Sequence, residues 1–185
     1  GVMLLAAVAA GAEDGVCVLR QGLPNASRIW KAGRQEATVF YIGGAAGNAP
    51  GGTRDQLPKV VKAAFPEARG VRAFCAWNRS YPDNCSSIIE TFRAMSSSAA
   101  VTGEGHWPFV ALTVIDLSAD DIGMPERQVL AALEGMVGRT RRRSPGRDMV
   151  MLHPADARFV AAYREGREPE AVRLHEAVAA HYGIP

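Results

Sequence analysis

The residues best placed for chemistry follow a short apolar run that ends in two glycines. The run Thr38–Ile42 is rich in β-branched and aromatic residues, and Gly43 and Gly44 come directly after it. This pattern predicts a buried strand that enters a sharp turn. In an open parallel α/β sheet such a turn lies at the ligand crevice, and the residue after it is where a nucleophile is expected. That residue is Ala45, whose methyl group cannot attack a substrate.

Three aspartates follow a second apolar run. Asp116 comes directly after Pro108–Ile115, and Asp120 and Asp121 lie in the loop beyond it. Their carboxylates could bind a cation or sugar hydroxyls, but acids in this position also cap the following helix. We expect capping for Asp120 and Asp121.

The histidines and cysteines lack the spacing of metal ligands. His175 and His181 lie six residues apart on a predicted helix and therefore on different faces of it. We expect no metal and no cofactor. His153 follows a predicted strand and could face the crevice, but a histidine in this setting is more often a capping or satisfied loop residue. None of the nearby serines follows a strand through a tight glycine turn, as a nucleophile would; they are Ser80, Ser86 and Ser87.

Strands and helices alternate along the chain. The expected strands cover residues 38–42, 71–76, 108–115 and 148–152. Six helices are expected, of which three have both ends defined: residues 23–32, 155–164 and 169–181. A fourth is capped by Thr53 or Asp55 and ends near residue 65, and a fifth ends near residue 95. The sixth is a long helix that begins at Pro125. Pro58 fits only in the first turn of its helix. This alternation predicts a parallel sheet in a three-layer α/β/α sandwich.

The composition fits one globular domain. The chain has 185 residues, of which 48% are hydrophobic and 22% charged, and a formal charge of +2. That charge is too small to imply a nucleic-acid partner, and no apolar run is long enough to span a bilayer. Arginines 139 and 141–143 lie in the last turns of a predicted helix, where cations are favoured by the helix dipole, and we expect their side chains to be exposed to solvent. The partners expected are therefore small molecules or carbohydrate.

The first 15 residues leave two alternatives open. Val2–Ala12 is apolar with small residues at its end, which fits a secretory signal remnant or a buried N-terminal helix. Residues 16–185 then form the main domain. In an oxidising compartment Cys75 and Cys85 could pair, although we favour the three cysteines, which include Cys17, as small buried hydrophobes. Whether the chain is secreted stays open. If it is secreted in a eukaryote, the three Asn-x-Ser patterns at residues 25, 78 and 84 are candidate glycosylation acceptors.

Several stretches together resemble the SGNH/GDSL hydrolase family. Residues 22–25 (GLPN), 31–33 (KAG) and 40–44 (FYIGG) are similar to the lead-in to that family's nucleophile loop, and residues 175–185 (HEAVAAHYGIP) are similar to the helix and turn before its last core strand. The resemblance implies a flavodoxin-like sheet and the activity of an esterase, lipase or carbohydrate deacetylase. It also implies substrate contacts at the crevice from Gly43, Gly44, Asn48, Asn78 and Ser80.

The catalytic blocks of that family are degenerate here. The family's serine falls on Ala45, and its oxyanion-binding asparagine falls on Ile115, which leaves only the following acid, Asp116. The loop after the second strand, residues 76–80, has no glycine to donate to an oxyanion. The Asp-x-x-His block that supplies the family's base would follow Pro185. We therefore expect an ester or acetyl-ester hydrolase by descent that is inactive as given, or alternatively a non-catalytic module that binds carbohydrate or protein.

The family's sheet continues with a fifth strand and a helix after the position of Pro185. Without them, the fourth strand forms an edge of the sheet. We expect the 185-residue chain to form a homo-oligomer through this exposed edge or to melt at low temperature. A longer version is expected to be monomeric and more stable.

Overall fold

A computed structural model describes residues 22–33, 36–75, 110–143, 145–154 and 156–184. Its elements, in chain order, are α1 (Pro24–Ala32), β1 (Glu36–Gly43), α2 (Ala45–Asn48), α3 (Thr53–Ala64), β2 (Arg69–Cys75), β3 (Val110–Asp116), α6 (Glu126–Arg143), β4 (Asp148–Met151), α7 (Ala157–Arg164) and α8 (Glu170–Tyr182). The predictions for residues 1–21, for the loop with Asn78 and Ser80, for the helix ending near 95, and for Cys17 and Cys85 fall outside the described residues.

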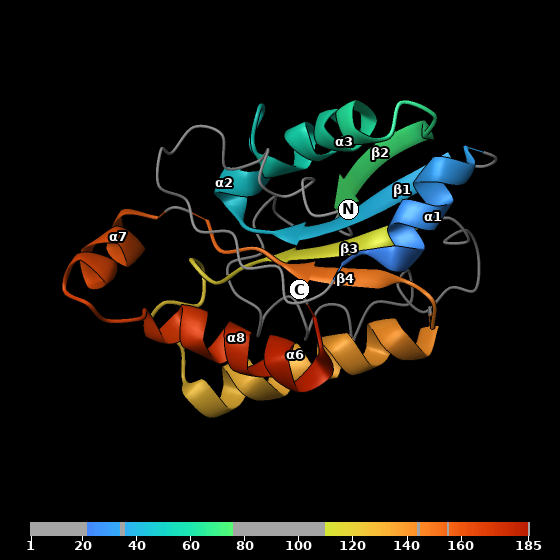
Figure 1. Ribbon diagram of the computed structural model, residues 1–185. Helices are drawn as coiled ribbons and strands as arrows, with labels where there is room; N and C mark the ends of the chain where they lie inside the picture. The colour runs from blue at the N-terminus through green and yellow to red at the C-terminus, as the bar shows by residue number, and fades with distance from the viewer. Residues whose placement is uncertain (1–21, 34–35, 76–109, 144, 155, 185) are drawn as a thin grey trace.

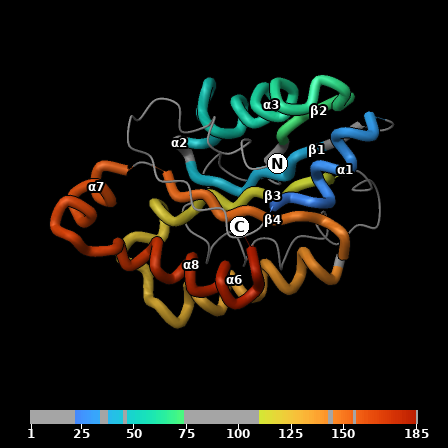
Figure 2. The backbone as a smooth tube through the Cα atoms, in the orientation of Figure 1, coloured from blue at the N-terminus to red at the C-terminus, as the bar shows by residue number. Residues whose placement is uncertain are grey.

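The four strands form one parallel sheet in the order β2-β1-β3-β4. Figure 1 shows the strands side by side with helices above and below them. This is the predicted three-layer α/β/α sandwich, with a sheet of the flavodoxin-like kind. In the backbone trace of Figure 2, α3 lies above the strands, and α6 and α8 lie below them.

Alternate residues of the central strands face the two helix layers. Phe40 and Ile42 of β1 belong to a core cluster with α6 and α8, whereas Val39 and Tyr41 belong to a second cluster with α1 and α3. Every residue of β3 is buried, as expected for a parallel strand covered on both faces. The side chains at the carboxyl ends of β1 and β3 are therefore fixed by packing on both faces of the sheet.

Helix α3 contradicts two of the sequence predictions. No side chain caps it: Gly52 precedes its first residue, Thr53. Pro58 lies inside the helix rather than in its first turn. A proline in a helix interior costs about 3 kcal/mol because it removes one backbone hydrogen bond. The helix continues because Leu57 and Val61 are both buried against the sheet, and each such burial contributes about 1.5–3 kcal/mol.

Within the described ranges, no helix has the length and apolar character needed to cross a membrane.

Candidate functional site

The carboxyl ends of β1 and β3 bring the predicted site residues together. Gly43 is the register partner of Asp116, and the Gly44 amide donates to the Asp116 carbonyl at 3.3 Å. Ala45 is the first residue of α2. The prediction that Ala45 and Asp116 lie at the same end of the sheet is confirmed.

The Asp116 side chain is buried and paired at the carboxyl end of β3. Asp116 is 6% exposed, and the Tyr41 hydroxyl donates to its Oδ2 at 2.5 Å. Burial raises the pKa of this carboxyl, and hydrogen bonds from Tyr41 and Thr53 act in the opposite direction. Gly47 leaves room for the pair, since a Cβ on this residue would lie 1.8 Å from the Tyr41 oxygen.

Asn48 holds the glycine turn in place. Its Nδ2 donates to the carbonyls of Gly43 at 2.5 Å and Gly44 at 3.1 Å. Its Oδ1 is buried without a hydrogen-bond partner among the described residues. The amide donors of Asn48 therefore serve the turn, and its predicted contact with substrate stays a prediction.

Ile115 contributes no polar side chain to this end of the sheet. It is fully buried, and its side chain belongs to the core cluster shared with α6. Its carbonyl accepts from the Leu152 amide at 2.8 Å, which ties β3 to the segment after β4. At this position the chain offers no side-chain donor to an oxyanion.

Asp120 lies against the turn that follows β1. A Cβ built on Gly44 would be 2.1 Å from Asp120 Oδ2, so the carboxylate packs directly on the Gly44 backbone. Burial, together with the neighbouring Asp116 and Asp121, raises the pKa of Asp120 to about 6. A negative charge at this turn opposes the development of an oxyanion there.

The raised pKa of Asp120 predicts a pH-dependent stability. The folded chain binds this proton more tightly than the unfolded chain, so ionisation between about pH 4 and pH 6 destabilises the fold. Asp120→Asn removes the free-energy cost of holding an ionised carboxylate at this position in the folded chain. We expect it to stabilise the fold by about 1 kcal/mol above pH 7, after allowance for solvent screening, and to change nothing at pH 4. Urea unfolding at pH 4 and pH 8 measures the difference.

Asp156 provides a control because its pKa is shifted in the opposite direction to that of Asp120. Hydrogen bonds from the Arg158 side chain and amide lower the pKa of Asp156 to about 2. Asp156→Asn should therefore destabilise the fold at pH 8 and lose that effect as the pH falls toward 2. An Asp120→Asn variant that behaves like Asp156→Asn would contradict the proposed cause.

Asp121 is part of a buried pair rather than a helix cap. Its Oδ2 lies 2.7 Å from His175 Nε2, and neither side chain is exposed to solvent. The capping prediction for Asp121 is wrong because α6 begins only at Glu126, while His175 of α8 reaches the loop after β3. The signal available in the sequence was the position of His175 on the apolar face of its helix, where a histidine needs a polar partner.

A second imidazole links three elements beside this pair. His153 Nδ1 lies 3.0 Å from the Ser118 hydroxyl, and Nε2 lies 2.8 Å from Glu176 Oε1. The His153 and His175 rings meet edge to face, with centroids 6.0 Å apart. His153 is thus a satisfied loop residue, as the sequence favoured. Sequence reasoning did not find Ser118 or Glu176.

In comparisons with known proteins, no protein-family model, no curated protein and no solved structure matches the chain.

Among the described residues, metal ligands do not gather at this end of the sheet. No three histidine, cysteine or acidic side chains of the described ranges are placed to hold a metal ion. The residues that do meet at the carboxyl edge can accept hydrogen bonds through carboxylates and exchange protons through Asp120. They provide no hydroxyl at the turn where a nucleophile would stand.

Proposed function

We propose that this chain is a non-catalytic binding module on a hydrolase-like scaffold, which holds a small hydroxyl-rich ligand at the carboxyl edge of its sheet. The observation that carries the proposal is the turn after β1, where Ala45 stands in place of a nucleophile and Asp120 packs against Gly44. The half-buried Asp120 carboxylate can accept hydrogen bonds from hydroxyl groups, which favours a carbohydrate ligand.

The surrounding polar groups support binding over acyl transfer. Tyr41 is bonded to Asp116, and the Asn48 amide is bonded to the glycine turn. Removal of one oxyanion donor alone costs a hydrolase about 2.7–4 kcal/mol of transition-state stabilisation. Here Ile115 replaces one such donor and no hydroxyl follows Gly44. Descent from an ester or acetyl-ester hydrolase remains part of this proposal.

Esterase assays test the proposal through Ala45. We expect no burst of p-nitrophenol from p-nitrophenyl acetate, either with the natural chain or with Ala45→Ser. A serine hydroxyl attacks an ester only when a base takes its proton, and the resemblance places that base in a block that would follow Pro185. A burst whose amplitude matches the enzyme concentration would contradict the proposal.

A second candidate function rests on the Ser118–His153–Glu176 chain, which has the connectivity of a hydroxyl, imidazole and carboxylate triad. Ser118 is fully buried, which favours a structural role. A fluorophosphonate probe separates the two candidates, and we expect no labelling of the natural chain. Labelling that Ser118→Ala abolishes and the control variant Ser27→Ala retains would establish the second candidate.

Ligand binding is measured directly by calorimetry with a panel of neutral mono- and disaccharides. The natural chain should bind at least one of them, and Asp120→Asn should weaken that binding. Asp156→Asn, at the start of α7, should not. Failure of the whole panel together with an absence of esterase activity would remove the carbohydrate assignment.

A further inference from the structure

Asp120 differs from the other two carboxylates at the carboxyl edge of the sheet in its hydrogen bonding. The Tyr41 hydroxyl donates to Asp116. The buried His175 imidazole pairs with Asp121. Among the residues that the structure describes, none donates a hydrogen bond to the Asp120 side chain. That carboxylate is half-buried, so its oxygens are open to a donor that arrives from solvent.

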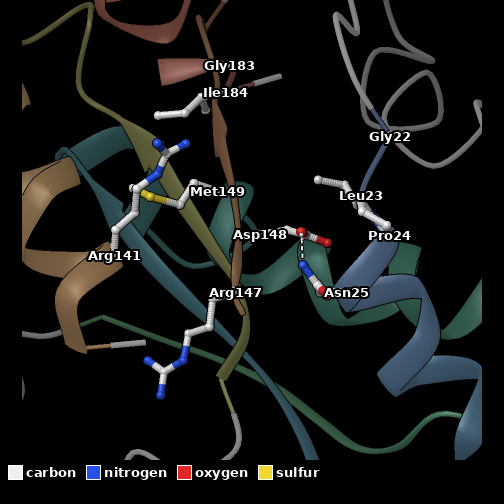
Figure 3. A pocket seen from close by; sticks show the side chains of 10 residues that line it. All are labelled: Gly22, Leu23, Pro24, Asn25, Arg141, Arg147, Asp148, Met149, Gly183 and Ile184. Carbon is white, nitrogen blue, oxygen red and sulfur yellow. Dashed lines mark hydrogen bonds between the residues drawn. The ribbon is translucent and has the colours of Figure 1, made fainter. Parts of the chain in front are cut away.

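A carboxylate at the opposite end of the sheet shows the contrast. Asp148 begins β4 beside a cavity of about 230 Å³, and Figure 3 shows its side chain bonded to Asn25. Its two oxygens accept from Asn25 Nδ2 at 3.1 Å and from the Ala26 amide at 2.8 Å. Protein donors thus stabilise the ionised form of Asp148, whereas the described part of the chain provides none at Asp120.

The charged groups around Asp120 come from three segments of the chain. Those that act on its side chain are three carboxylates and one guanidinium, on Asp116, Asp121, Asp156 and Arg158. The turn after β1, residues 43–52, has no titratable side chain, and His175 of α8 is paired with Asp121. Burial is the largest cause that raises the pKa of Asp120 to about 6, the three carboxylates add to it, and Arg158 opposes it. The ionised form of Asp120 is therefore the costly one in the folded chain.

A ligand hydroxyl that donates to Asp120 acts unequally on its two protonation states. Hydrogen bonds to an ionised acceptor are about twice as strong as those between neutral groups. The ligand therefore binds the ionised form more tightly and lowers the proton affinity of Asp120. The two effects are reciprocal, so protonation weakens ligand binding by the same factor.

We propose that Asp120 links ligand binding at this edge of the sheet to a proton, so that a hydroxyl-rich ligand is held when its carboxylate is ionised and released when it takes up a proton. This inference rests on the function proposed above and adds the condition under which the ligand leaves. Binding breaks the O–H bond of the Asp120 carboxyl, and the proton passes to solvent. Acidification from pH 8 to pH 4 reverses this step.

Calorimetry with glucose, xylose and cellobiose at pH 4, 5.5 and 8 tests the proposal. These sugars have no group that titrates in this range, so any proton exchanged comes from the protein. A sugar that binds at pH 8 should bind about tenfold more weakly at pH 4, as expected when the acceptor of a hydrogen bond loses its charge. Titrations in two buffers of different ionisation enthalpy count the protons. About half a proton should be released for each sugar bound near pH 5.5, and none at pH 8.

Three variants assign the proton. Asp120→Asn should bind equally at pH 4 and pH 8 and release no proton. Glu134→Gln, which neutralises an exposed carboxylate of α6, should behave like the natural chain. Arg158→Gln keeps the test valid if Asp120→Asn fails to fold: it removes the cation that lowers the pKa of Asp120, so the pH of maximal proton release should rise.

The outcomes separate this inference from the proposed function. Equal affinity at pH 4 and pH 8 without proton release overturns the inference and leaves the proposed function standing. Proton release that persists in Asp120→Asn, or a maximum that moves to lower pH in Arg158→Gln, also overturns it. If none of the three sugars binds at pH 8, the proposed function loses its support, and this inference falls with it.

Discussion

Asp121→Leu is expected to destabilise the fold by about 3–5 kcal/mol, because it removes one partner of a buried pair and leaves the His175 imidazole without it. Both side chains are fully buried, and Nε2 of His175 lies 2.7 Å from the Asp121 carboxylate. The other ring nitrogen, Nδ1, is buried without a hydrogen-bond partner among the described residues. Thermal unfolding followed by circular dichroism should show a fall in Tm of about 10 °C.

Two further variants separate the loss of charge from the loss of packing. Asp121→Asn keeps an oxygen that can accept from Nε2, so it should cost less than Asp121→Leu. Adding His175→Leu to Asp121→Leu removes the orphaned imidazole and should recover part of the stability. Glu165→Ala breaks an exposed pair with Arg167 and should change the stability by less than about 1 kcal/mol. An Asp121→Leu variant as stable as Glu165→Ala would contradict this account.

The buried pair also shows where sequence reasoning reaches its limit. Asp121 and His175 lie 54 residues apart, and Tyr41 and Asp116 lie 75 residues apart. Each contact depends on how one element is rotated against another, and that rotation follows from packing of the whole core. Local patterns do not encode it, so sequence reasoning assigned capping to Asp121 and found no partner for His175.

Local patterns did predict the framework of the site. The run of β-branched and aromatic residues before Gly43 predicted β1, and the continuous apolar run before Asp116 predicted β3. Since carboxyl ends of parallel strands meet at one edge, Ala45 and Asp116 could be placed together from the sequence alone. The same local reasoning failed at Pro58, because burial of Leu57 and Val61 against the sheet outweighs the helix-breaking tendency of the proline.

The close packing at this edge makes its glycines sensitive to any added atom. Tyr41 is fully buried, so its ring has little room to move away from a neighbour. A Cβ on Gly47 would lie 1.8 Å from the Tyr41 oxygen and 3.2 Å from Asp116 Oδ2. In α6, by contrast, a Cβ on Gly138 would meet its nearest neighbour, Arg142, only at 3.5 Å.

Gly47→Ala is therefore expected to destabilise the fold by about 3 kcal/mol, through overpacking and through loss of the buried bond between Tyr41 and Asp116. Gly138→Ala introduces the same methyl group where there is space for it, and should stabilise α6 by up to about 1 kcal/mol. Urea unfolding of the two variants beside the natural chain measures both changes. If Gly47→Ala matched the natural chain in stability, the Tyr41 hydroxyl would have moved without cost, and its bond to Asp116 could not be a significant part of the stability of this edge of the sheet.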